Sequence, residues 1–236
     1  MKFISCILLL TITLSATAQN HKKDMVMPMS TLNIGGSFQK FDGLNSRVTG
    51  LPQFKSLKDN TVTLGLGWLK EEKKIVSSGN ITVGSSISGD RDKKSSTIRY
   101  GTINLDLGYD LIKSEKIMLY PFAGLGYQRY QAIFFKDNTG VAFNDVLQSA
   151  TVKNTISSVR FNNSFFVYRL GLGFAVSSAK CPGSSIGFQA GYAGSFKSRA
   201  WRSNENQTLG NAPVDKINQF FGSLVFISTP KFMNSK

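Results

Sequence analysis

The clearest pattern in the chain is a strict alternation of side-chain size between Phe165 and Val176. Every second side chain from Phe166 onwards is large and apolar, and the positions between hold mostly glycine and alanine, with Arg169 in the middle. A period of two predicts a β-strand. At ~3.3 Å per residue and a tilt of ~45°, such a strand spans about 28 Å, close to the hydrocarbon thickness of a bilayer. One apolar face and one small or polar face are typical of a transmembrane barrel strand.

Seven further segments show the same period of two. They cover approximately residues 30–40, 60–70, 76–88, 97–112, 117–134, 184–198 and 216–229. In the segment 97–112, Leu105, Leu107 and Tyr109 alternate with polar or small residues that include Asp106 and Asp110. Acidic side chains cannot occupy a dry core without partners. The second face of these strands is therefore expected to line a polar lumen.

Short and long connections alternate along the chain without exception. The short ones are 71–74, 113–116 and 179–183, and the long ones are 41–59, 89–96, 136–163 and 199–215. This alternation predicts an all-β fold, an eight-stranded antiparallel up-and-down transmembrane β-barrel with turns at one end and long loops at the other. Both termini then lie on the side of the turns, which is the periplasmic side in a bacterial outer membrane.

The first residues have the pattern of a secretory signal peptide. Lys2 precedes the apolar stretch Ile4–Leu14, and Ala16-Thr17-Ala18 is a small-residue cleavage site. Its removal leaves Cys181 as the single cysteine, so no internal disulfide can form. Export without disulfides favours a bacterial envelope protein. The expected organisation is a signal peptide at 1–18, a periplasmic tail at 19–29, the barrel at 30–229 and a C-terminal tail at 230–236.

Two glycine-rich motifs carry a resemblance to a known family. Tyr120–Tyr127 (YPFAGLGY) and Leu170–Phe174 (LGLGF) resemble the small bacterial outer-membrane β-barrel family, the superfamily of outer membrane protein A and X type. The resemblance covers essentially all of the chain after the signal peptide and is more specific for fold than for function. It implies a porin-like barrel in the outer membrane of a Gram-negative bacterium, folded by the barrel-assembly machinery. That machinery usually reads a terminal aromatic residue, a role left here to Phe226, Phe232 or a different signal.

A soluble lipocalin-like barrel, which would bind a ligand inside, is the alternative fold. It also has eight up-and-down strands, but with apolar side chains inside and polar ones outside. That arrangement would crowd five large rings into one small cavity and leave a solvent face built largely of glycine. The rings are those of Trp68, Tyr168, Phe174, Phe188 and Tyr192. The face chemistry therefore favours the membrane barrel.

The residues that catalysis usually needs are scarce. His21 is the single histidine and lies in the N-terminal tail, outside the strands. Without a histidine at the loop end, a hydrolase or acyltransferase lacks its usual general base. No Cys/His cluster suggests a metal, and no glycine-rich phosphate loop precedes a helix. The sequence therefore predicts a protein without enzymatic activity and without a cofactor.

The charged residues within the strands allow two interpretations. One is an internal network of salt bridges and hydrogen bonds that fills the narrow interior expected for eight strands. The other is a conducting pathway, which would make the protein a narrow pore or small-solute conduit. The residues concerned are Arg99, Asp106, Asp110, Arg129 and Arg169.

The chain is strongly basic, with a formal charge of +14 and a pI near 9.9. In the outer loops these charges would meet outer-membrane lipid and phosphate-bearing lipopolysaccharide. Candidate contacts are Lys93, Lys94, Arg199, Arg202 and Trp201, the last as an amphipathic rim anchor. A basic surface without a specific partner is the alternative, and an exported protein is not expected to bind nucleic acid. The predicted role is structural or surface-interacting, through long basic extracellular loops that contact lipid or an unknown surface ligand.

Overall fold

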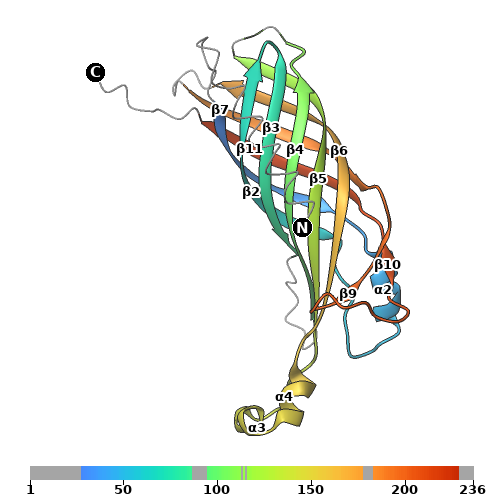
Figure 1. Cartoon of the computed structure of the whole chain (residues 1–236). Helices are drawn as coiled ribbons and strands as arrows, with labels where there is room; N and C mark the ends of the chain where they lie inside the picture. The colour runs from blue at the N-terminus through green and yellow to red at the C-terminus, as the bar shows by residue number, and fades with distance from the viewer. Residues whose placement is uncertain (1–27, 87–94, 113, 115, 178–182, 229–236) are drawn as a thin grey trace, which may run out of the picture.

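The computed structural model describes residues 28–86, 95–112, 114, 116–177 and 183–228. The signal peptide, His21, Lys93, Lys94, Cys181 and the tail at 230–236 lie outside the described residues. Eight long antiparallel strands form a closed barrel, which confirms the predicted fold class (Figure 1). They are β1 (Met29–Phe38), β2 (Asn60–Glu72), β3 (Ile75–Ser85), β4 (Ser95–Tyr109), β5 (Ile117–Phe135), β6 (Val159–Ser177), β7 (Ser184–Ser195) and β11 (Asn218–Ser228).

Each of these strands pairs with a neighbour on both sides. The sheet order is β5-β4-β3-β2-β1-β11-β7-β6, and the additional pairing of β5 with β6 closes the ring. In the closing seam Leu125 lies opposite Tyr168, and in the β1–β11 seam Ile34 lies opposite Leu224. Closure satisfies the backbone hydrogen bonds that an open sheet edge would leave unpaired.

The outer surface of the barrel is apolar. Leu66, Leu105 and Leu172 each expose about 60% of their surface, at 65%, 62% and 59%. The positions between them on the same strands point inward and are polar or small, such as Thr63 and Asn104. This burial is the inverse of a lipocalin-like barrel, so the soluble alternative is wrong and the chain is a transmembrane barrel. None of the described helices is both long and apolar enough to cross a membrane.

The connections differ at the two ends of the barrel. We call them the turn end and the loop end. At the turn end, Lys73 and Lys74 join β2 to β3 with positive φ angles of 52° and 71°, which suits the right-handed twist of a hairpin. The loop end carries α2 (Asp42–Thr49), α3 (Phe143–Gln148), α4 (Ala150–Ile156), β8 (Arg199–Ala200), β9 (Arg202–Ser203) and β10 (Val214–Asp215). The predicted separation of short turns from long loops is confirmed.

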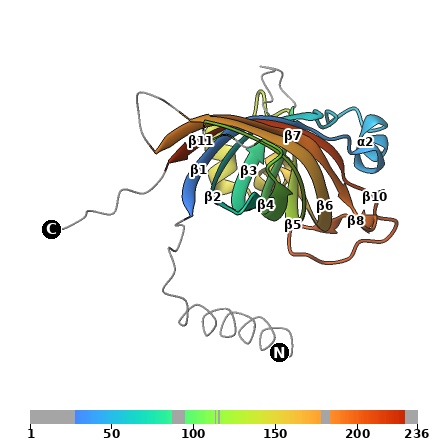
Figure 2. The same cartoon turned by 90° about the horizontal axis from the view of Figure 1, so that it is seen from above.

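Two structures stand out at the loop end. Strands β5 and β6 continue past the barrel and carry α3 and α4 on a projecting hairpin (Figure 1). Helix α2, which the sequence pattern did not predict, lies beside β10 at the side of the barrel mouth (Figure 2). The described chain begins with β1 and ends with β11, and both of these termini lie at the turn end.

The barrel interior is layered. An apolar cluster around Phe41, Tyr130 and Trp201 fills the loop end. A second apolar cluster around Tyr120 and Phe122 fills the turn end. Buried polar side chains occupy the middle, and we call them the polar belt. The interior of an eight-stranded barrel is just wide enough for side chains to fill it, and here they do.

Candidate functional site: a filled lumen beneath an ordered loop cap

A buried ion pair lies at the centre of the polar belt. Arg169 on β6 places Nε 3.4 Å from Oδ1 of Asp106 on β4, and both side chains are buried. The two strands are separated by β5, where Gly124 lies opposite both residues. A Cβ at position 124 would lie only 2.0 Å from that carboxylate oxygen. The glycine therefore leaves the space through which the arginine reaches the acid.

Arg169 also contacts β11, which is separated from β6 by β7. Its guanidinium carbon lies 4.6 Å from the ring centroid of Phe221 on β11, a cation–π arrangement. The two atoms of the ion pair, Arg169 Nε and Asp106 Oδ1, have no hydrogen-bond partner. Charge attraction and the aromatic ring therefore hold this arginine in place, and together they link three strands across the interior.

A chain of hydrogen bonds crosses the lumen beside the ion pair. The hydroxyls of Thr61 and Ser37 lie 2.6 Å apart, and Nε2 of Gln219 donates to Ser37 Oγ over 2.9 Å. Gln128 donates through Nε2 to Oε1 of Gln219 over 3.0 Å, and Tyr130 donates its hydroxyl to Gln128 Oε1 over 2.8 Å. The chain runs from β2 and β1 through β11 to β5, so it joins opposite walls. Its members satisfy one another, which makes the buried polar groups stabilising.

Little space remains inside the belt. Asn104 donates through Nδ2 to Oδ1 of Asn80 over 2.8 Å, and Gln189 donates to the Tyr120 hydroxyl over 2.7 Å. The cavity lined by Asn80, Asn104, Gln189 and Arg169 has a volume of about 50 Å³. That volume holds a few water molecules and is far from a continuous channel.

Asp215 organises the cap over the loop end. Its carboxylate accepts hydrogen bonds from the indole Nε1 of Trp201 at 2.6 Å and from the backbone N–H groups of Gly43 at 2.7 Å and Leu44 at 3.0 Å. The last two groups are free donors in the first turn of α2, where a negative charge also opposes the positive end of the helix dipole. One carboxylate therefore fixes α2, β10 and the loop that carries Trp201.

Trp201 seals the lumen and does not anchor the rim. Its side chain is only 1% exposed. It packs edge-to-face on Phe41 with ring centroids 5.8 Å apart, and Phe41 packs on Tyr130 at 5.2 Å. Tyr130 in turn stacks on Tyr100 at 5.0 Å. The prediction that Trp201 faces the membrane surface is wrong, because the buried Asp215 carboxylate draws its indole N–H inward.

The predicted lumen network is only partly assembled. Asp106 and Arg169 meet, as described, but Asp110 lies at the turn end and accepts hydrogen bonds from the backbone N–H groups of Ile112 and Leu119. Arg99 and Arg129 are exposed on the outer wall, so their placement in the lumen is wrong. The physical reason is strand parity. Both arginines lie an even number of residues from outward-facing side chains of their own strands, Ile103 on β4 and Tyr127 on β5.

The surface of the loop end combines exposed cations with an apolar tip. Arg199 and Arg202 are exposed, and Nη1 of Arg199 donates to the backbone oxygen and the hydroxyl of Ser164 over 3.1 and 3.3 Å. On the projecting hairpin, the side chains of Phe143 and Leu147 are 75% and 70% exposed. Among the described residues, no group of three His, Cys, Asp or Glu side chains is placed to hold a metal.

Comparisons with known proteins were made for sequence and for structure. No protein-family model matches the chain, and no curated protein matches it. Among solved structures, it is similar to the attachment invasion locus protein Ail of Yersinia pestis, with 16% identity, a TM-score of 0.45 and coverage of 85% of this chain and 98% of that one. It is also similar to Neisserial surface protein A, with 12% identity, a TM-score of 0.47 and coverage of 85% of this chain and 96% of that one. A third similar structure is a major outer membrane protein of Thermus thermophilus, with 13% identity, a TM-score of 0.46 and coverage of 84% of this chain and 98% of that one.

Proposed function

We propose that the protein is a closed, non-conducting and non-enzymatic barrel of the bacterial outer membrane that presents ordered loops at the cell surface. The observation that carries this proposal is the wall-to-wall filling of the lumen. The ion pair, the crossing hydrogen-bond chain beside it and the aromatic cap above them each obstruct the interior. A pore would need all three to move.

The loop end supplies the surface for contacts. Arg199 and Arg202 are exposed there beside other basic loop residues, and cations gain favourable contacts with anionic headgroups such as those of lipopolysaccharide. The apolar tip at Phe143 and Leu147 suits an additional surface ligand, because exposed apolar side chains gathered on one projection favour association. Export by the signal peptide at 1–18 and insertion by the barrel-assembly machinery, with both termini in the periplasm, complete the proposal.

Planar-bilayer recording tests the closed barrel directly. Protein refolded in detergent and shown to be folded by heat-modifiable migration on gels is expected to insert without steady conductance. Protein that fails the gel test serves as the control for detergent artefacts. Reproducible stepwise conductance from the folded fraction alone would overturn the proposal in favour of a narrow conduit. Outer-membrane fractionation of producing cells tests the location, and recovery in the soluble periplasm would refute it.

A further inference from the structure

Arg99 and Arg129 border a groove on the outer wall of the barrel. On β4, Gly101 lies between Val83 of β3 and Arg129 of β5 in the strand register. Nothing lies within 4 Å of where a Cβ at Gly101 would be, so the glycine leaves an open floor. Arg99 flanks this floor one outward position further along β4. The groove has a volume of about 770 Å³.

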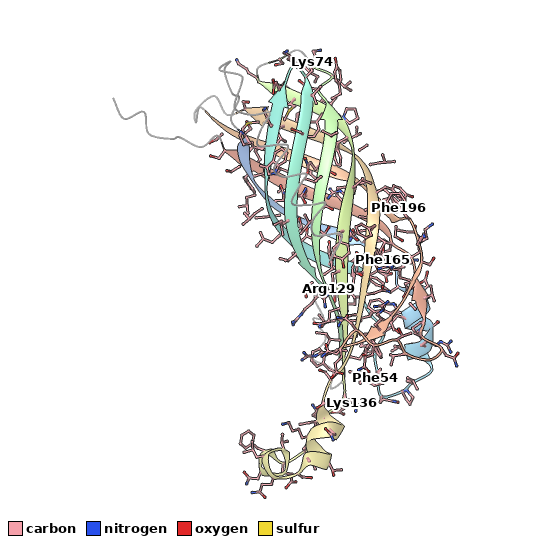
Figure 3. The ribbon with its side chains drawn as sticks, in the orientation of Figure 1. Phe54, Lys74, Arg129, Lys136, Phe165 and Phe196 are labelled. Carbon is pink, nitrogen blue, oxygen red and sulfur yellow. The ribbon has the colours of Figure 1, made fainter. Side chains whose placement is uncertain are left out.

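The groove lies at the edge of the apolar band. Along β5, the ten residue steps from Ile117 to Tyr127, tilted by ~45°, rise roughly 23 Å, about the height of the apolar band of an outer-membrane barrel. Tyr127 pairs with the ring of Phe166 at 5.2 Å, as in an interfacial aromatic girdle. Arg129 comes next on that face and points away from the barrel (Figure 3). It therefore lies at headgroup depth, where a wall-facing arginine costs about 0–1 kcal/mol.

The charge of the groove is uncompensated within the described part of the chain. No carboxylate there forms an ion pair with either Arg99 or Arg129. The two arginines occupy diagonal positions on the paired strands β4 and β5. Residues at such positions are usually ~7–8 Å apart. Arg129 lies opposite Ser164, the residue to which Arg199 donates, so a third guanidinium stands at the same edge.

The other side of the groove is apolar. Val62 and Leu64 of β2 and Val83 of β3 line it, and each exposes half or more of its surface. A cationic side at headgroup depth and an apolar side continuous with the lipid-facing wall match a lipid that carries a phosphate. A soluble anion would use the arginines but gain nothing from the apolar side.

We propose that this groove binds one phosphorylated lipid of the outer leaflet, with a phosphate between Arg99 and Arg129 and an acyl chain against Val62, Leu64 and Val83. Guanidinium groups suit this task because they donate paired hydrogen bonds to phosphate oxygens in a fixed geometry. The inference rests on the proposed outer-membrane orientation, which puts the loop end in the outer leaflet. It differs from general attraction by the loops, since it assigns the contact to two strand residues on the barrel wall.

Native mass spectrometry of the refolded protein in detergent tests the site with diphosphoryl lipid A as the probe. Arg99→Gln/Arg129→Gln is expected to lower the affinity at least tenfold. The matched control Lys73→Gln/Lys116→Gln removes the same charge from exposed positions at the turn end and should change the affinity less than twofold. Heat-modifiable migration of every variant shows that the barrel is folded.

A second variant separates the groove from its charge. Gly101→Leu keeps both arginines, and nothing lies within 4 Å of the Cβ that it adds, so it should fold and still lower lipid affinity at least fivefold. Equal losses in both charge variants, or no loss in Gly101→Leu, would overturn the assignment. Displacement of the lipid by an equal concentration of inorganic pyrophosphate would likewise refute a lipid site. These results do not depend on conductance, so this proposal and the closed-barrel proposal can fail separately.

Discussion

Removal of one charge from the buried ion pair tests the most consequential part of the interior. Asp106→Asn keeps the shape of the side chain but leaves the Arg169 guanidinium without a counter-charge. The arginine cannot turn towards bulk water, because its side chain is only 8% exposed and lies between β4 and the ring of Phe221. The substitution therefore leaves a desolvated cation inside a closed barrel.

The distance sets the scale of the effect. At 3.4 Å and an effective dielectric constant of ~20, two unit charges attract by about 5 kcal/mol. Removing one partner of a buried pair generally costs about 3–5 kcal/mol, because the remaining charge stays buried and uncompensated. The same loss is expected here for Asp106→Asn, a large share of the ~5–15 kcal/mol that stabilises a typical domain. In Asp106→Asn/Arg169→Gln both charges are gone, so the loss should be smaller than the sum of the two single losses by about 2 kcal/mol or more.

Urea unfolding in phospholipid vesicles, followed by tryptophan fluorescence, measures these free energies. Asp145→Asn, an exposed position on α3, is the matched control and should change stability by no more than about 0.5 kcal/mol. Single losses that add up in the double variant would show that Asp106 and Arg169 do not stabilise each other. The reasoning would then be wrong, even if each single variant were unstable.

Two further predictions address the wall and the cap. Leu105→Arg puts a charge near the middle of the apolar band and should lower the free energy of unfolding by about 2–4 kcal/mol. Arg99→Leu, at headgroup depth, should lower it by no more than about 1 kcal/mol. Equal losses in the same urea assay would contradict the proposed depth of Arg99. Asp215→Ala leaves the Trp201 indole and two helix donors without their acceptor, so acrylamide should quench Trp201 more strongly. A Trp68→Phe background isolates that signal, because the chain has two tryptophans, and unchanged quenching would show that Asp215 does not hold the cap.

The fold can be predicted from the sequence mainly because the strands alternate large apolar residues with small or polar ones. Residues 165–176 predict both the strand and its faces, because one face is uniformly large and apolar while the other is mostly glycine and alanine with Arg169 in the middle. The same parity would have placed Arg99 and Arg129 outside, in line with Ile103 and Tyr127. Their assignment to the lumen followed residue type instead of register. Charge alone is therefore a poor guide to facing near the ends of a membrane strand, where a wall-facing arginine costs little.

The cap could not be predicted from local sequence patterns, because the contacts that hold it join residues far apart in the chain. Helix α2 is short and begins without a side-chain cap of its own, and its capping acid comes from Asp215, on a strand far along the chain. Trp201 likewise lies between two arginines in sequence, which suggests a rim anchor, yet its indole binds that same distant acid.

Two glycines within the strands connect the sequence to the two candidate sites. Gly124 and Gly101 both interrupt a face of the barrel, one inward and one outward. At Gly124 the missing side chain lets the Arg169 and Asp106 charges meet across a strand and helps close the lumen. At Gly101 it opens a hollow at the proposed membrane edge, beside two arginines that form no ion pair within the described part of the chain. A glycine in a barrel strand weakens the strand slightly. Its benefit is the space that it leaves for side chains of the neighbouring strands or for a ligand. This contrast supports the two proposals made above, that contacts are made at the outer surface and its lipid boundary and that the filled interior keeps the barrel closed.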